Sequence, residues 1–456
     1  MTYNQNKMSS LFDIIVAGAG ASGLMAAGRA AERGARVLLV EKMPKVGLKL
    51  GLTGKGRCNL TNLGDIPTFI ESYYPDGRFL RNSLARFFNR DLMDFFEKRG
   101  VPVSVERGQR VFPQSNQARD VVKALSDYIR EKGVHLIKDN PIQDLLFSQG
   151  KIEGVRCREG EFKGRAVILA TGGASYTKTG SSGDGYRLAQ KAGHSLVPIR
   201  PFLIPLVVEE DWIRELQGLS LKNVKATLYP KGQKDQSEFG EMVFTHFGIS
   251  GPIILTLSGR VGECLRKGRV EIGINFKPAL SADQLDQRLQ RELTAHHRKG
   301  FQGLLKTLLP NSLIPVFIRL LQIPADKKGH QITGEERARI RALLTDFRLS
   351  IKGLRPLEEA IVTAGGVSLK EVDPRTLESR ILQGLYLCGE VLDIQGKTGG
   401  YNLQAAFSTG WVAGESAAEK LVADSSQLIG KKAKANKLVA DSSQLKGKKA
   451  RAIAQS

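Results

Sequence analysis

Short apolar runs and a helix-favouring stretch alternate at the start of the chain. Residues 13–17 form an apolar run typical of a buried strand, and residues 24–33 form an alanine-rich stretch that favours a helix. Gly34 follows as a helix C-cap, and residues 36–40 repeat the strand pattern and end at Glu41. The order strand, helix, strand predicts a βαβ unit with parallel strands.

The middle of the chain shows two other periodicities. Residues 224–229 and 270–274 alternate apolar and polar side chains, which is typical of strands with one buried face. Leu285, Leu289 and Leu293 then recur at helical spacing. The pattern therefore predicts a β-barrel followed by a helical region.

The first strand-to-helix turn carries the glycine pattern of a dinucleotide-binding loop. Gly18 would make the tight turn, Gly20 would let a pyrophosphate approach the backbone, and Gly23 would let the helix pack close to the strand. The helix N-terminus would supply amide donors and a positive dipole. Glu41 ends the next strand, 18 residues after Gly23, where a carboxylate accepts hydrogen bonds from ribose hydroxyls. The sequence therefore predicts dinucleotide binding.

The far end of the chain favours FAD over NAD. Residues 384–388 form a short strand that runs into Gly389 and Glu390, and Gly399 and Gly400 open an alanine-rich helix. Two glycine-marked strand ends so far apart suggest one long ligand that touches both. Glu390 could accept hydrogen bonds from the ribityl hydroxyls, and a helix N-terminus stabilises negative charge on a reduced flavin.

Charge and glycine content depart from the ordinary. The 456 residues include 68 Lys and Arg against 46 Asp and Glu, a net charge of +22, and 49 are glycine. The basic excess raises nucleic acid, an anionic membrane or an anionic ligand as partners. The glycine excess indicates many positions with positive φ or close backbone approach.

Several classes of protein are excluded by what the chain lacks. No apolar run approaches the roughly 20 residues of a membrane helix, and the polar start of the chain does not resemble a secretory signal. The four cysteines form no CxxC pair, and His296 and His297 lack metal-ligand spacing. We therefore predict a cytoplasmic enzyme without membrane insertion, disulfide scaffold or metal.

The C-terminal end contains a duplicated, basic segment. Residues 420–428 recur as residues 437–445, and each copy is followed by a Lys-rich run. Residues 420–456 hold nine Lys and Arg against two Asp, about a third of the net charge. Two copies are too few for a solenoid. We predict a polar appendage, with a tether for RNA or membrane as the alternative.

Five ordered motifs together resemble a known family. They lie in residues 18–42, 49–62, 166–185, 244–252 and 360–404. With them the chain resembles the HI0933-like family of FAD-dependent oxidoreductases, which includes aminoacetone-oxidase-type FAD-binding enzymes and bile-acid 3-dehydro-Δ4,6-reductases. The second motif is similar to the family pattern K-x-x-x-S-G-G-G-R-C-N-x-T-N, but Thr53 and Lys55 replace a Ser and a Gly. Lys55 puts a long cation into a loop that is normally small, so flavin-face geometry or substrate preference would differ.

The resemblance implies an α/β fold in which both chain ends build one Rossmann-type FAD-binding domain around inserted barrel and helical domains. We expect residues 1–198 and 368–419 to form the two parts of the FAD-binding domain, 199–280 the first part of the barrel, 281–346 a helical cap, 347–367 the return strands of the barrel, and 420–456 the tail.

The resemblance and the glycine loops together predict the cofactor-binding residues. They are Gly18, Gly20, Ala21, Ser22, Gly23, Glu41, Lys42, Lys49, Gly54, Gly56, Arg57, Cys58, Asn59, Ile142, Thr171, Gly172, Gly389, Glu390, Gly399, Gly400, Tyr401, Asn402 and Leu403. Cys58 could instead be a redox thiol, but it has no nearby partner cysteine, which favours a packed or backbone-contacting thiol. Tyr401 and His246 are the candidate proton donors, and each could equally be a structural residue.

The leading functional hypothesis is a flavin oxidoreductase that passes hydride from NAD(P)H through flavin N5 to an activated C=C of a small-molecule substrate. The positive net charge of residues 1–419 allows an anionic substrate. Because no second glycine loop follows a strand, NAD(P)H would dock transiently in the substrate cleft. Two alternatives stay open: an FAD-containing protein associated with RNA, of the tRNA-modifying type, and an oxygen-dependent oxidase of a small amine. The sequence fixes neither the substrate nor the oligomeric state.

Overall fold

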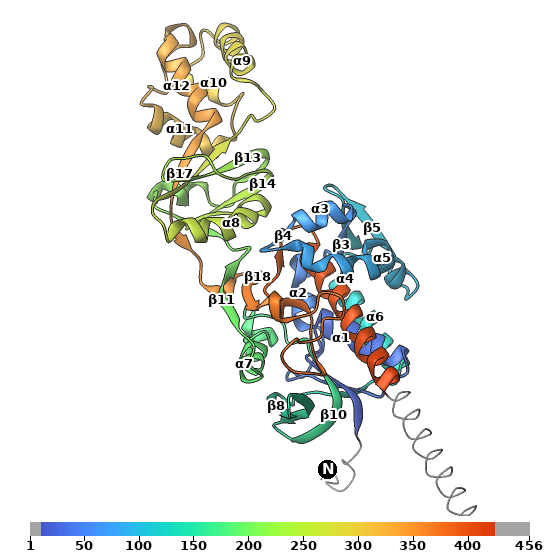
Figure 1. Ribbon diagram of the computed structural model, residues 1–456. Helices are drawn as coiled ribbons and strands as arrows, with labels where there is room; N and C mark the ends of the chain where they lie inside the picture. The colour runs from blue at the N-terminus through green and yellow to red at the C-terminus, as the bar shows by residue number, and fades with distance from the viewer. Residues whose placement is uncertain (1–10, 425–456) are drawn as a thin grey trace, which may run out of the picture.

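The computed structural model describes residues 11–424 (Figure 1). They form a large α/β unit and a narrower unit of barrel and helices that projects from it. Each unit has its own cluster of buried hydrophobic residues. Most of the predicted tail, from residue 425 onward, lies outside the described residues, as does the chain before Leu11.

A seven-stranded sheet forms the centre of the larger unit. Its strands are β1 (Phe12–Ala17), β2 (Val37–Val40), β7 (His135–Ile137), β8 (Ile142–Ser148), β9 (Lys151–Cys157), β10 (Gly160–Leu169) and β19 (Leu385–Leu387). The strand order is β7-β2-β1-β10-β9-β8, and β19 pairs with β10. β7, β2, β1, the second half of β10 and β19 run parallel, whereas β9 pairs antiparallel with β8 and with the first half of β10. Since β19 comes from the far end of the chain, both chain ends build this sheet, as predicted.

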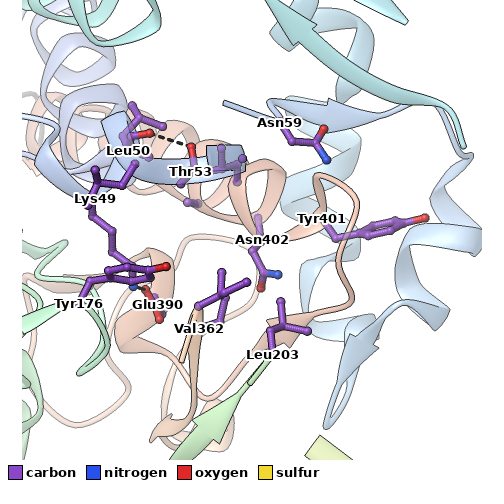
Figure 2. A pocket seen from close by; sticks show the side chains of 18 of the residues that line it. Lys49, Leu50, Thr53, Asn59, Tyr176, Leu203, Val362, Glu390, Tyr401 and Asn402 are labelled. Carbon is purple, nitrogen blue, oxygen red and sulfur yellow. Dashed lines mark hydrogen bonds and ion pairs between the residues drawn. The ribbon is translucent and has the colours of Figure 1, made fainter. Parts of the chain in front are cut away.

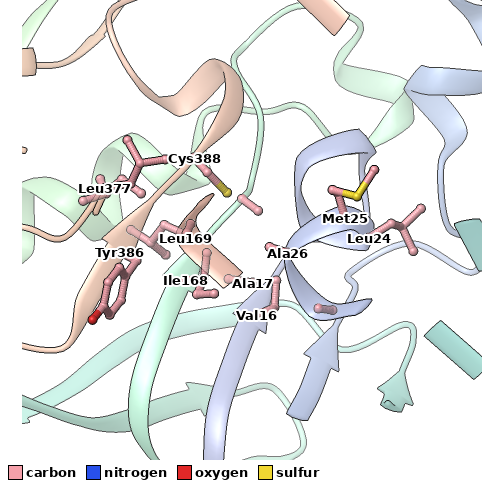
Figure 3. Packing of buried hydrophobic residues seen from close by; sticks show 14 of the residues in the cluster. Val16, Ala17, Leu24, Met25, Ala26, Ile168, Leu169, Leu377, Tyr386 and Cys388 are labelled. Atoms are coloured by element: carbon pink, nitrogen blue, oxygen red, sulfur yellow. The ribbon is translucent and has the colours of Figure 1, made fainter. Parts of the chain in front are cut away.

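Apolar strands pack against helix α1 (Ala21–Glu32) in the core of this unit (Figure 3). Val16 of β1, Met25 of α1 and Leu169 of β10 are fully buried. Cys388 directly follows β19 and is fully buried as well. The continuous apolar runs of the sequence are explained by burial on both faces of a parallel sheet.

The final helix, residues 401–424, packs closely on α1. A Cβ atom added to Gly410 would lie 2.3 Å from the carbonyl oxygen of Ser22, and one added to Gly414 would lie 2.3 Å from that of Ala26. These glycines therefore bring the two helix backbones together. The N-termini of the two helices belong to the two glycine loops noted in the sequence.

The narrower unit contains a closed β-barrel, as predicted. Its strands are β12 (Leu206–Val208), β13 (Ser220–Pro230), β14 (Ser237–Thr245), β15 (Gly248–Ser250), β16 (Val270–Asn275) and β17 (Phe347–Leu354), in the order β12-β15-β14-β13-β16-β17. Helix α8 (Pro252–Leu265) packs on β13 and β14. Four helices lie between β16 and β17 in the chain and extend the unit: α9 (Ala282–Ala295), α10 (Phe301–Leu305), α11 (Ile314–Leu321) and α12 (Gly334–Thr345).

One predicted assignment is wrong. Residues 347–367 were expected to return wholly to the barrel, but only β17 does so. β18 (Val362–Val367) pairs with β11 (Leu196–Phe202) in a separate two-stranded sheet between the units. The close approach of the two strands depends on Gly365, where a Cβ atom would lie 2.2 Å from the carbonyl oxygen of Pro198. An apolar strand pattern does not show which strand will be its partner.

The large unit has further helices and strands. They are α2 (Leu48–Gly56), β3 (Thr61–Asn62), α3 (Ile66–Glu71), β4 (Tyr73–Tyr74), α4 (Arg81–Arg86), α5 (Asn89–Glu97), β5 (Val103–Glu106), β6 (Arg110–Pro113), α6 (Ala118–Glu131), α7 (Asp184–Lys191) and β20 (Gln395–Gly396). β3, β6 and β5 form one small sheet, and β20 pairs with β4. Within residues 11–424, no helix combines the length and apolar character needed to cross a membrane.

Candidate functional site

A cavity of about 1360 Å³ lies where the carboxyl ends of β1 and β2, the start of helix 401–424 and the barrel face one another. It exceeds the roughly 300–1,000 Å³ of common small-molecule sites. Several contacts join the units at its edge: Lys397 Nζ lies 3.4 Å from Glu238 Oε1, the hydroxyls of Thr398 and Thr256 are 3.2 Å apart, and Arg107 donates to Asn223 Oδ1 at 2.7 Å. The cavity therefore has one wall from each unit.

Most of the predicted cofactor-binding residues meet in this cavity. Those that line it are Gly18, Gly20, Ala21, Ser22, Glu41, Lys42, Lys49, Gly54, Arg57, Asn59, Ile142, Thr171, Gly172, Gly389, Glu390, Gly399, Gly400, Tyr401, Asn402 and Leu403. Gly23, Gly56 and Cys58 are not part of its lining.

The first glycine loop leaves room for a ligand. A Cβ atom on Gly23 would lie 1.9 Å from the carbonyl oxygen of Gly18, so this glycine holds α1 against the loop. A Cβ atom on Gly20 would meet no atom within 4 Å and would extend from the cavity wall. Gly20 is also the N-cap of α1 and offers no side-chain cap, so the first amides of the helix are left for another acceptor. These features fit a dinucleotide pyrophosphate.

Glu41 closes the same end of the cavity. Its carboxylate accepts hydrogen bonds from the amides of Ala19 at 2.6 Å and Met43 at 2.9 Å. Burial raises the pKa of Glu41 above its usual value and outweighs these hydrogen bonds, which act in the opposite direction. The neighbouring Lys42 reaches across to Asp184 of α7, with 2.5 Å between Nζ and Oδ2.

The loop expected around Lys55 begins within the last residues of α2. α2 is kinked, because Thr53 is extended and Gly54 and Lys55 have left-handed backbone conformations. Arg57, expected to bind flavin or phosphate, forms an ion pair with Glu106 of the small sheet. Its guanidinium also lies 4.2 Å from the centre of the Phe112 ring. Arg57 thus lines the cavity with its charge already compensated.

Glu390, which was predicted to accept hydrogen bonds from the ribityl hydroxyls, is bonded to other groups of the protein. Glu390 Oε2 lies 2.6 Å from Lys49 Nζ, and its Oε1 accepts a hydrogen bond of 2.8 Å from the amide of Thr363 (Figure 2). Lys49 also donates to Ser175 Oγ at 2.9 Å. The carboxylate is therefore fixed in position at the cavity wall.

The second glycine loop is fixed by close contacts. A Cβ atom on Gly400 would lie 2.3 Å from the carbonyl oxygen of Thr61. The side-chain amide of Asn402 accepts a hydrogen bond from the backbone N–H of Gly396 and donates one to its carbonyl oxygen, both at 2.7 Å. Asn59, with its amide group in the favourable orientation, accepts a hydrogen bond from the amide of Gly400 at 3.0 Å. The loop therefore presents the N-terminus of helix 401–424 to the cavity.

The two predicted proton donors differ in position. Tyr401 lines the cavity, but its ring packs edge-on against Phe69 at 4.7 Å between centres and extends away from Lys49 and Glu390 (Figure 2). His246 is exposed at the turn between β14 and β15 and stands outside the lining of the cavity. The position of His246 therefore does not support the prediction that it donates a proton. The same Phe- and Gly-rich sequence around a histidine can occur in a hairpin turn of a barrel and in an active site.

Comparison with known proteins identifies the family. The family model of the HI0933-like protein Rossmann domain matches residues 12–416. The chain belongs to this family. It is thereby an oxidoreductase of an FAD-dependent family, as the motifs predicted.

Relatives of this HI0933-like chain span nearly its whole length. It is 33% identical over 409 residues to a 3-dehydro-bile acid delta(4,6)-reductase of Clostridium scindens, covering 89% of this chain and 98% of that protein. It is 32% identical to a ribosomal RNA dihydrouridine synthase of Escherichia coli, covering 91% and 99% of the two chains. In fold it is similar to a 3-ketosteroid delta1-dehydrogenase of Sterolibacterium denitrificans, with a TM-score of 0.51, 14% identity, and coverage of 90% and 100%.

Several residues of the HI0933-like site were not anticipated from the sequence. Tyr176 lies beside Lys49 and Glu390 in the cavity, with a left-handed backbone (φ 56°) (Figure 2). Leu52, Phe239 and Ile361 are apolar residues that line the cavity with exposed fractions of 52%, 59% and 38%. No local pattern distinguishes these side chains from core residues, because they come from separate elements that only the fold brings together.

All four cysteines of the HI0933-like chain are buried and free. Burial raises the pKa of the Cys58 thiol to about 12, and burial does the same for Cys157 and Cys388. Thiolate chemistry needs the deprotonated sulfur. Cys58 is therefore a packed thiol in this fold.

We expect the native protein to resist thiol labelling. At a pH of about 8, where a free thiol is partly ionised, a thiol-reactive disulfide reagent should modify none of the four cysteines until denaturant is added. Rapid release of one equivalent from the native protein, lost in Cys58→Ala, would contradict the assignment.

Proposed function

We propose that the chain is an FAD-dependent reductase of a C=C bond conjugated to a carbonyl group, with NAD(P)H as electron donor. The observation that carries the proposal is one continuous cavity, which joins both glycine loops to exposed apolar side chains of α2, β14 and the residue before β18. Its volume supports a cofactor and a substrate together. The match to a 3-dehydro-bile acid delta(4,6)-reductase supports the reaction type.

The chain's own residues would hold the two reactants. FAD, when bound, supplies the hydride-transfer chemistry. The α1 N-terminus and Glu41 would hold its adenosine half, and the N-terminus of helix 401–424 would stabilise negative charge at the other end. Leu52, Phe239 and Ile361 would cover an apolar substrate and exclude water. Tyr401 and Tyr176, the tyrosines that line the cavity among the described residues, are the candidate proton donors.

We expect NADH or NADPH to bleach the flavin under anaerobic conditions, and a conjugated ketone to restore the absorbance. The visible spectrum of the protein, reconstituted with FAD, measures both steps. One nucleotide should react faster and so identify the donor. A protein that acquires no flavin spectrum, or reduced flavin that no conjugated ketone reoxidises, would overturn the proposal.

The same proposal predicts ping-pong kinetics, because nucleotide and substrate would use one cleft in turn. Initial rates at several substrate concentrations should give parallel reciprocal plots. Intersecting lines would instead mean that both reactants bind at once, in separate sites.

A second candidate is reduction of uridine in RNA, whose C=C is also conjugated to a carbonyl. The observation that favours it is the basic rim of the cavity, where Arg107 and Arg110 stand beside Arg57 on and near the small sheet. The match to a ribosomal RNA dihydrouridine synthase agrees with it. Incubation of the FAD-loaded protein with NAD(P)H and ribosomal RNA should then add two hydrogens to a uridine, detected by nucleoside mass spectrometry, with binding that weakens steeply as salt rises.

A further inference from the structure

Lys55 occupies a backbone position that suits glycine. Its φ and ψ are 58° and 41°, within the kink of α2 and between Gly54 (φ 57°) and Gly56 (φ 82°). A residue with a Cβ atom costs roughly 1–2 kcal/mol in this left-handed region. The motif that this segment resembles has glycine here. The chain thus has a lysine at a position where the backbone alone favours glycine.

The Lys55 ammonium has no partner among residues 11–424. Lys55 is exposed and lines the cavity, and no hydrogen bond or ion pair joins it to a described residue. By contrast, Lys42, Lys49 and Lys397 of the same lining pair with carboxylates at 2.5, 2.6 and 3.4 Å. Lys45 also lacks a partner, but its backbone is not in the left-handed region.

The charge around Lys55 is positive. Two residues further along, Arg57 forms an ion pair with Glu106, and Arg110 Nη2 lies 3.9 Å from the same carboxylate. The guanidinium groups of Arg57 and Arg110 lie 4.2 and 5.8 Å from the centre of the Phe112 ring. Arg57 and Arg110 therefore share one carboxylate and Lys55 has none, which leaves a positive potential at this side of the cavity that attracts an oxyanion.

Apolar side chains accompany this charge. Leu52 lies three residues before Lys55 in the kinked α2, and Phe239 of β14 and Ile361, which directly precedes β18, line the same cavity. An apolar body with one oxyanion would satisfy both sets of groups.

We propose that Lys55 binds an oxyanion, a carboxylate or a phosphate, carried by the apolar substrate that the cavity reduces. This assignment rests on the proposed function. It makes Lys55 a specificity-determining residue, and it gives the departure from the glycine of the motif a chemical reason.

The test compares matched substrates in the FAD-loaded enzyme. The probes are a 3-oxo bile acid with a conjugated C=C, its methyl ester, and the phosphate ester of the corresponding side-chain alcohol. We expect the wild-type KM to be lower for an anion than for the methyl ester. Lys55→Met should raise the KM of the preferred anion by about tenfold, which corresponds to about 1.4 kcal/mol. Lys55→Arg should keep most of the preference, and added salt should reduce it.

Lys231→Met is the matched control. Lys231 is also an exposed lysine with a left-handed backbone (φ 49°), but it lies on the barrel outside the cavity lining. The Lys231→Met substitution should leave the KM of every probe unchanged. A raised KM of Lys55→Met for either anion supports the proposal. An effect on only one anion identifies that anion as the oxyanion, and an effect on both means that Lys55 accepts either. Equal KM ratios in wild type and Lys55→Met, or an effect confined to the KM for NADPH, would overturn it.

A binding measurement separates this proposal from the proposed function. The saturated bile acid cannot be reduced, so its binding is followed as a shift of the visible flavin band at equilibrium. Weaker binding of the acid, but not of its ester, to Lys55→Met supports the subsite even if no ketone is turned over. Equal binding to both forms of the enzyme overturns it.

Discussion

Replacing Gly20 by alanine is expected to leave the fold intact and to weaken FAD binding by about 5- to 150-fold. The backbone of Gly20 (φ −85°, ψ −167°) is open to any residue, and the added Cβ atom meets no protein atom within 4 Å. It would occupy the space over which a pyrophosphate must pass, and overpacking of this kind costs about 1–3 kcal/mol. Titration of the apoprotein with FAD, followed by fluorescence quenching, measures the change.

Replacing Gly23 by alanine in the same loop is expected to destabilise the fold itself, unlike the change at Gly20. Its Cβ atom would lie 1.9 Å from the carbonyl oxygen of Gly18, so α1 would have to move away from the strand. We expect a loss of at least about 3 kcal/mol in the free energy of unfolding of the apoprotein. If Gly20→Ala binds FAD as well as wild type does, the glycine loop does not hold a pyrophosphate, and the assignment of this end of the cavity is wrong.

Replacing Glu415 by glutamine is expected to destabilise the protein by about 3–5 kcal/mol at neutral pH. The Glu415 side chain is only 6% exposed and pairs with Arg29, Arg33 and Arg86. It thereby ties helix 401–424 to α1 and α4. Glutamine would leave three guanidinium groups without their shared counter-charge, which urea unfolding at neutral pH would measure.

The pH dependence of Glu415 gives the prediction a second measurement. Burial alone would raise the pKa of Glu415, but hydrogen bonds from Arg33 and Arg29 outweigh it and lower the pKa to about 2. Since an unfolded glutamate titrates near about 4.3, the stabilisation is complete above that pH and is lost as the pH falls through about 2. The difference between wild type and Glu415→Gln should therefore shrink over this window.

Glu419→Gln is the control for this cluster. Glu419 lies one turn further along the same helix, 3.8 Å from Arg33 and 3.9 Å from Arg86, but its side chain is 55% exposed. Its removal should cost less than about 1 kcal/mol. Similar losses from both substitutions would show that general charge balance, rather than the buried carboxylate, stabilises the helix pair.

Local patterns were sufficient for the features that one segment determines. The glycine loop after β1 and the acid at the end of β2 depend on backbone conformation within a few residues, and the structure brings Gly18, Gly20 and Glu41 to one cavity. The barrel and the helices could be predicted because periodicity reflects one buried face. The same local reasoning could not show that His246 lies outside the cavity lining or that β18 pairs with β11, because only spatial neighbours decide both.

By itself, the sequence determined the family, the α/β class with an inserted barrel, and the loops that face the cavity, because motifs and glycine positions act over short stretches of backbone. The tertiary structure alone decided the charge pairing. It joins Lys49 to Glu390 and Arg29 to Glu415, and it leaves Lys55 without a partner among the described residues. Such pairs form between residues hundreds of positions apart, and their geometry follows from how strands and helices pack rather than from any spacing along the chain.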